Sequence, residues 1–103
     1  MNLFFLSEIK WISPKKGGRL NLPKEGVKYC PIIDIKNDKK NKWSIEIICP
    51  DFSKTNIISF RFLSKEAPVY EITKKCKYSL YEGRKEVAEI VILNSKAYDN
   101  DVK

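Results

Sequence analysis

Apolar and polar side chains alternate with a period of two residues along several short segments of this chain. The pattern is clearest at residues 43–47 and 58–62, where Trp, Ile or Phe at every second position is separated by Ser, Glu or Arg. This is the period of a β-strand with one buried face, because successive side chains of a strand point to opposite sides of the sheet. No segment sustains the 3.6-residue period of an amphipathic helix. The chain is therefore predicted to be all-β.

The alternating segments are separated by turn signals, and together they predict six strands. The strands are expected at residues 9–11, 30–35, 43–47, 58–62, 76–80 and 87–93. The breaks between them are Pro14–Gly18 with the loop that follows it, the polar segment 36–42, Pro50-Asp51 and the connector 64–75. Glu82-Gly83-Arg84-Lys85 has the composition of a tight hairpin turn, in which Gly83 is free to adopt a positive φ.

Short strands spaced by turns within 103 residues are typical of a single β-sandwich or β-barrel domain. Closing the sheet into a barrel removes exposed strand edges, which helps a small monomer to stay soluble. We therefore predict a closed six-stranded antiparallel β-barrel spanning residues 1–103, with its core at about 7–94 and a polar tail at 95–103.

The predicted core consists of the apolar side of each alternating segment. Its members are Ile9, Trp11, Ile33, Trp43, Ile45, Ile47, Ile58, Phe60, Phe62, Tyr78, Leu80 and Val91. Cys30, Cys49 and Cys76 each fall in an apolar run, so we expect them to be small core residues in a reducing compartment. Because no two cysteines are close in sequence and the chain has no His, no zinc or other metal site is expected.

The chain carries 20 Lys and Arg against 13 Asp and Glu, a net charge of +7. An evenly basic surface attracts polyanions and acidic proteins, but it also arises where Lys is simply the default surface residue. No apolar run is long enough for a signal peptide or for the ~20 residues of a membrane span. We therefore expect a cytoplasmic protein without a membrane partner.

Catalytic chemistry has no candidate residues in this sequence. There is no His, no Ser or Cys with a plausible base, and no pair of converging carboxylates for acid–base work. A phosphate-binding loop of the form Gly-x-x-x-x-Gly-Lys-Ser/Thr is also missing from the sequence. The chain is therefore predicted not to be an enzyme and to use no nucleotide or other cofactor.

Four segments, in order, resemble the C-terminal β-barrel domain (the third domain) of translation elongation factor Tu. Glu8-Ile9-Lys10-Trp11-Ile12-Ser13 followed by Gly17-Gly18-Arg19 is similar to that domain's first strand and Gly-Gly-Arg loop. Pro23, Gly26, Tyr29 and Pro31 match the start of its second strand, and Glu46-Ile47-Ile48-Cys49-Pro50 matches its Glu-x-Val-x-Pro turn. Tyr78-Ser79-Leu80-Tyr81-Glu82-Gly83 followed by Val87 is similar to its closing hairpin. The resemblance covers about residues 8–93 and implies the same barrel.

The resemblance also implies where a partner would bind. In the factor this domain contacts the T-stem of tRNA, and the matching positions here are Arg19, Glu82 and Gly83. The chain departs from the family where Tyr29-Cys30-Pro31-Ile32 replaces Tyr-Arg-Pro-Gln, so one basic and one amide side chain are lost. The loop at 19–29 is also longer, and Glu89 stands where the family has a small residue.

Two hypotheses about function follow. In the first, the chain is a free-standing barrel that binds another protein, as an accessory, regulatory or immunity-type protein. Its contact residues would be Gly18, Arg19, Glu82, Gly83 and Arg84, on two turns where Arg19 and Arg84 are expected to be exposed. Outward-facing Tyr70 and Tyr81 would support this hypothesis. In the second, the basic surface binds RNA or tRNA, with Lys on phosphates and aromatic rings on bases.

Overall fold

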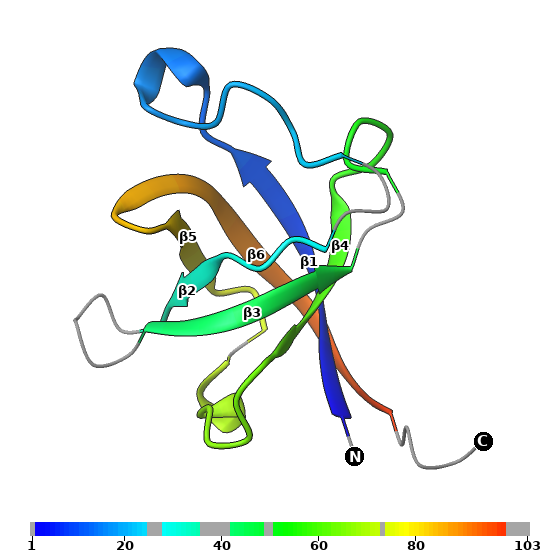
Figure 1. The fold of residues 1–103 in the computed structure, drawn as a ribbon. Helices are drawn as coiled ribbons and strands as arrows, with labels where there is room; N and C mark the ends of the chain where they lie inside the picture. Colours follow the sequence, from blue (N-terminus) through cyan, green and yellow to red (C-terminus); the bar gives the residue numbers. More distant parts are fainter. Residues whose placement is uncertain (1, 25–27, 36–41, 49–50, 73, 99–103) are drawn as a thin grey trace.

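The computed structural model describes residues 2–24, 28–35, 42–48, 51–72 and 74–98. Six strands and two short 3-10 helices make up the fold (Figure 1). They are β1 (Asn2–Trp11), η1 (Pro14–Lys16), β2 (Ile32–Asp34), β3 (Lys42–Ile48), β4 (Ile57–Phe62), η2 (Val69–Glu71), β5 (Lys77–Glu82) and β6 (Lys85–Tyr98). Neither of these helices is long and apolar enough to cross a membrane.

The strands form a closed barrel in the order β1-β4-β3-β2-β5-β6. Every neighbouring pair is antiparallel, and the β1–β6 ladder closes the sheet on itself. The predicted closed six-stranded antiparallel barrel is thus confirmed. The expected polar segment at 36–42 falls almost entirely outside the described residues, as do Cys49 and Pro50.

Both terminal strands extend beyond the predicted barrel core. The apolar run that begins at Leu3 belongs to β1, and β6 continues to Tyr98 through residues expected to be a tail. These extensions pair with each other, from Phe5 opposite Ser95 to Asn2 opposite Tyr98. A polar end segment can therefore be a strand when a neighbouring strand supplies partners for its backbone.

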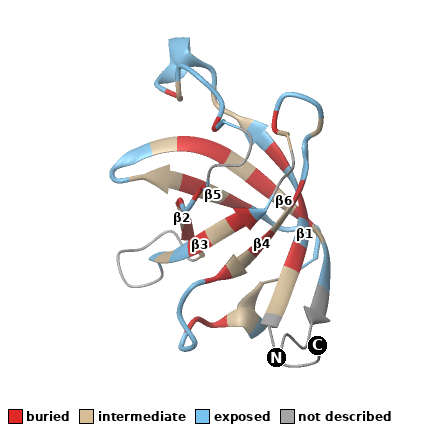
Figure 2. Cartoon of the chain, turned by 45° about the vertical axis from the view of Figure 1, so that its right-hand side comes forward, coloured by how far each residue is buried: buried red, intermediate tan, exposed pale blue. Residues whose placement is uncertain are grey.

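The barrel interior is filled by side chains of all six strands, and buried residues recur along each of them (Figure 2). The predicted core residues that are buried are Ile9, Ile33, Ile45, Ile47, Ile58, Phe60, Phe62, Tyr78 and Leu80. Trp11 and Trp43 are only partly buried, but both pack against this core. At its centre Phe60 stacks on Phe5 with ring centroids 5.1 Å apart.

The predicted inward position of Val91 is wrong, because the two neighbours Ile90 and Ile92 are the buried ones. A β-bulge causes the change. Leu80 pairs with Ala88 but Tyr81 pairs with Glu86, so Val87 is the extra residue of β6. Both Val87 and Ala88 are buried, and the alternation beyond them is shifted by one residue. A period of two counted on from Val87 therefore selects the wrong face.

The predicted burial of the cysteines is also wrong for both that the structure describes. Cys30 and Cys76 are exposed and make no disulfide. Cys30 lies between the buried residues Tyr29 and Pro31, so the alternation turns its side chain outward. Cys76 stands just before β5 and follows Lys75, whose φ of 70° bends the chain at the strand's start.

Replacing Phe60 with Ala should lower the free energy of unfolding by about 3–5 kcal/mol, because the site is enclosed and cannot collapse fully. Thermal and urea unfolding measure this change. The matched control is Ile57→Ala on the same strand, whose side chain is 42% exposed and should cost less than about 1 kcal/mol. Equal midpoints for the two variants would mean that the register of β4 is wrong.

Candidate functional site

The loop after β1 and the β5–β6 hairpin meet at one end of the barrel, opposite the end where β1 begins and β6 ends (Figure 1). The backbone N–H of Ile12 donates to the carbonyl of Val87 at 2.9 Å, which ties the start of the loop to β6. The two segments that the sequence selected for partner binding are therefore neighbours in space.

The loop turns tightly around Ser13. Its carbonyl accepts hydrogen bonds from Lys16 N at 2.9 Å and from Gly18 N at 3.0 Å, while Gly17 takes a φ of 93°. Gly18 is buried, and a Cβ placed on it would lie only 1.8 Å from the carbonyl oxygen of Ile12. Gly18 is thus required by close backbone packing, which accounts for this residue without any ligand.

The hairpin has the turn that its sequence predicts. Gly83 has a φ of 64° and Arg84 follows it between Glu82, the last residue of β5, and Lys85, the first of β6. A Gly with positive φ at the first central position is what a two-residue type II′ turn needs. Arg84 is exposed at the tip, as expected.

Arg19 does not face solvent as predicted, because its guanidinium is paired inside the protein. Its Nη1 lies 2.5 Å from Oε2 of Glu82, and its Nε donates to the carbonyl of Asn21 at 2.8 Å. The hydroxyl of Tyr29 donates to the same Glu82 oxygen at 2.5 Å, and Arg19 also lies 5.2 Å from the centre of the Tyr29 ring. Arg19 therefore fastens the loop to the hairpin through Glu82.

Arg19, Tyr29 and Glu82 form a triad whose electrostatics keep Glu82 ionised. Burial alone would raise the pKa of Glu82, but hydrogen bonds from Tyr29 and Arg19 outweigh it and hold the pKa below its ordinary value. Burial and the adjacent Glu82 carboxylate both raise the pKa of Tyr29, so its hydroxyl stays protonated and continues to donate. Arg19 and Glu82 thus satisfy each other's charge. Their side chains are 29% and 34% exposed, respectively.

An aromatic cluster packs against Tyr29 of the triad. Tyr29 contacts Trp11 and Phe52 with ring centroids 5.9 and 6.1 Å apart, and Trp11 lies 5.6 Å from Phe52. Tyr29 and Phe52 are buried, so the cluster closes this end of the barrel. Because the loop packs on these rings through Tyr29, its conformation is fixed.

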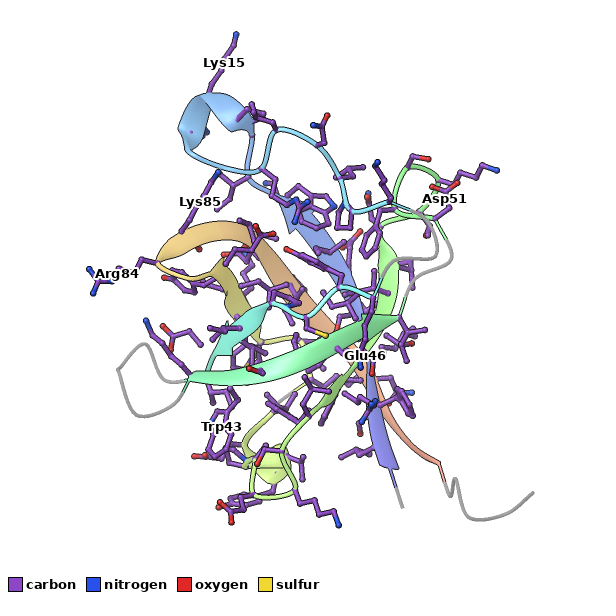
Figure 3. All side chains as sticks on the ribbon, in the orientation of Figure 1. Lys15, Trp43, Glu46, Asp51, Arg84 and Lys85 are labelled. Atoms are coloured by element: carbon purple, nitrogen blue, oxygen red, sulfur yellow. The ribbon has the colours of Figure 1, made fainter. Side chains whose placement is uncertain are left out.

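Four exposed cationic side chains lie on these two turns, and one of them, Lys85, helps to lower the pKa of Glu82. Lys15 and Lys16 lie on η1 and Arg84 and Lys85 on the hairpin; all four are exposed, and none forms an ion pair with another residue that the structure describes. Figure 3 shows Lys15 projecting from η1, and Arg84 and Lys85 projecting from the hairpin. Leu20, which follows Arg19 on the same loop, is exposed as well. We call Lys15, Lys16, Leu20, Arg84 and Lys85 the loop–hairpin surface.

Sequence reasoning missed Lys15, Lys16 and Leu20 as candidate contacts. The Pro-Lys-Lys segment was interpreted only as a strand terminator, although a Pro-led turn rich in Lys is the kind of segment that projects from a barrel end. A groove of about 370 Å³ runs beside it, lined by Lys16 of η1 and Glu86 of β6 among others. This shared lining places η1 directly over the start of β6.

The expected outward aromatics behave differently from each other. Tyr70 on η2 is 84% exposed, but it lies away from the loop–hairpin surface. Tyr81 is half-buried, and its ring is covered by the ammonium of Lys42, 4.8 Å from the ring centre. Neither ring contributes an open face to the loop–hairpin surface.

Comparison of the chain with protein-family models, curated proteins and solved structures finds no match. The resemblance to the elongation factor domain therefore stays a prediction.

Replacing Gly18 with Ala should destabilise the protein by about 1–3 kcal/mol, because the new Cβ forces the backbone near Ile12 to move. Unfolding monitored by tryptophan fluorescence, which reports on Trp11, measures the change. Ser13→Ala is the control: the Ser13 side chain makes no cap, so this variant should stay within about 0.5 kcal/mol of the parent. A fully stable Gly18→Ala variant would contradict the close approach.

The Arg19–Glu82 pair should show a coupling free energy of about 1 kcal/mol at pH 7 in a double-mutant cycle of Arg19→Met and Glu82→Gln. Because the folded pKa of Glu82 is lowered, its contribution is complete above the unfolded pKa of about 4.3 and is lost as pH falls through the folded value. Unfolding curves between pH 7 and pH 3 test this. A coupling that does not diminish in acid would show that the pair is not ionic.

Proposed function

We propose that this protein is a non-catalytic binding module that docks to another protein through the loop–hairpin surface. In this proposal it is a free-standing barrel, similar in form to the third domain of elongation factor Tu, that serves as an accessory, regulatory or immunity-type protein. The observation that carries the proposal is the set of four exposed cations, free of ion pairs within the described residues, on two rigidly joined turns.

Rigidity matters because binding is opposed by the entropy lost when loops become ordered. The bond from Ile12 to Val87, the ion pair of Arg19 with Glu82 and the close packing at Gly18 already fix the loop against the hairpin. A partner that contacts both turns therefore meets a surface that needs little further ordering. This favours a docking site over a pair of plain solvated turns.

The roles of the residues differ from those that the sequence indicated. Gly18, Arg19, Glu82 and Gly83 build and hold the surface, and Arg84 remains a direct contact. Its planar guanidinium can pair with a carboxylate through two hydrogen bonds, which makes Arg frequent in protein interfaces. Lys15, Lys16 and Lys85 add positive charge around it.

RNA binding is the second candidate, and the same cations favour it. However, Arg19, which the resemblance assigns to tRNA, already has its carboxylate partner in Glu82. The aromatic rings at this end, Trp11, Tyr29 and Phe52, pack against each other, so they are poorly placed to stack on bases. We therefore place protein docking first. The free thiols of Cys30 and Cys76 suit a reducing, cytoplasmic setting for either function.

Charge reversal of the hairpin, Arg84→Glu with Lys85→Glu, should remove a partner that the parent protein captures from its native lysate after nuclease treatment. Both side chains are exposed and unpaired among described residues, so stability should stay within about 0.5 kcal/mol. Lys65→Glu with Lys74→Glu, on the β4–β5 connector, is the matched control and should keep the partner. Capture that depends on intact RNA would support the second candidate, and capture unchanged by the hairpin reversal would place the interface elsewhere.

A further inference from the structure

The loop–hairpin surface carries an excess of positive charge. Residues 12–24 contain Lys15, Lys16, Arg19 and Lys24 but no Asp or Glu. The one carboxylate at the end of β5, Glu82, is already held by Arg19 and Tyr29. Two further carboxylates, Glu86 and Glu89, line the groove beside Lys16. The four exposed cations still outnumber them, so the surface keeps a positive balance that complements a negatively charged partner.

The same loop also exposes an apolar side chain. Leu20 is 83% exposed, more than any other large aliphatic side chain in the described residues. It follows Arg19 directly, and the bonds from Arg19 to Glu82 and to the carbonyl of Asn21 fix the backbone on both sides of it. Leu20 is thus held outward by the same ion pair that joins the loop to the hairpin.

From these two features together we infer that the partner is a protein segment in which several carboxylates surround an apolar side chain. The inference rests on the proposed function and adds the chemistry of the partner. The carboxylates pair with Lys15, Lys16, Arg84 and Lys85, and the apolar side chain packs on Leu20. Protein–protein contacts commonly combine apolar side chains with charged ones at their rim.

A nucleic acid would contact the cations of this surface but not its apolar side chain. Its phosphates would pair with the four cations, but Leu20 offers no aromatic face on which a base can stack. An RNA ligand would therefore gain nothing specific from Leu20, whereas an acidic peptide with a leucine would. The contribution of Leu20 separates the two classes of ligand.

Three labelled probes test the inference by fluorescence anisotropy near physiological salt. They are a 12-residue Asp/Glu peptide with two central leucines, the same peptide with serine for leucine, and an oligouridylate of equal charge. The leucine peptide should bind about fivefold or more tightly than the serine peptide. Leu20→Ser should abolish that difference, and Lys15→Gln with Arg84→Gln should weaken the leucine peptide about tenfold. Lys65→Gln with Lys74→Gln, the control, should leave it unchanged.

Three results would overturn the inference: no measurable binding of the leucine peptide, tighter binding of the oligouridylate, or a leucine preference that survives Leu20→Ser. The proposed function is tested separately by the hairpin reversal in the capture experiment. If the reversal still removes the captured protein while the leucine peptide fails to bind, docking at this surface stands and only the partner's chemistry is wrong. If both fail, the surface itself is wrong.

Discussion

The fold depends on the antiparallel ladder between β1 and β6, which joins the two ends of the chain and closes the barrel. It runs from Asn2 opposite Tyr98 to Trp11 opposite Ala88 and is the longest ladder of the structure. With this seam closed the six strands enclose a single packed core, in which Phe5 of β1 and Ile90 of β6 are both buried. Its far end also leads directly into the loop that carries η1, so closure of the barrel sets the position of the candidate site.

The fold could be predicted from the sequence because the burial of each alternating strand follows from the pattern of its own residues. Phe60 and Ile45 lie inside as the period of two requires. The misses have long-range causes: the bulge at Val87 depends on how β5 pairs with β6, and the strand at 95–98 forms because β1 lies beside it. Neither neighbour can be identified from the segment's own residues.

The candidate site was predicted by position but not by role. The segments around Arg19 and Glu82 do lie together, but the two residues form an ion pair with each other. The sequence could not indicate this pair, because its two charges lie far apart in the chain and meet only in the folded state. In the proposed function the direct contacts are therefore Arg84, which the sequence had selected, and Lys15, Lys16 and Lys85, which it had not. A residue matched to a binding position by resemblance can thus be a structural brace, and the geometry decides between the two.

The pairing of Asn2 with Tyr98 has a consequence for how the barrel can be connected to other chains. The paired residues Asn2 and Tyr98 lie at the end of the barrel opposite η1 and the hairpin (Figure 1). A fused domain or surface tether would therefore hold the loop–hairpin surface facing away from its attachment point, open to a partner. For the same reason a short peptide can link Asn2 to Tyr98 and the chain can be reopened at the β4–β5 connector, giving a circular permutant in which the loop–hairpin surface is left uncut.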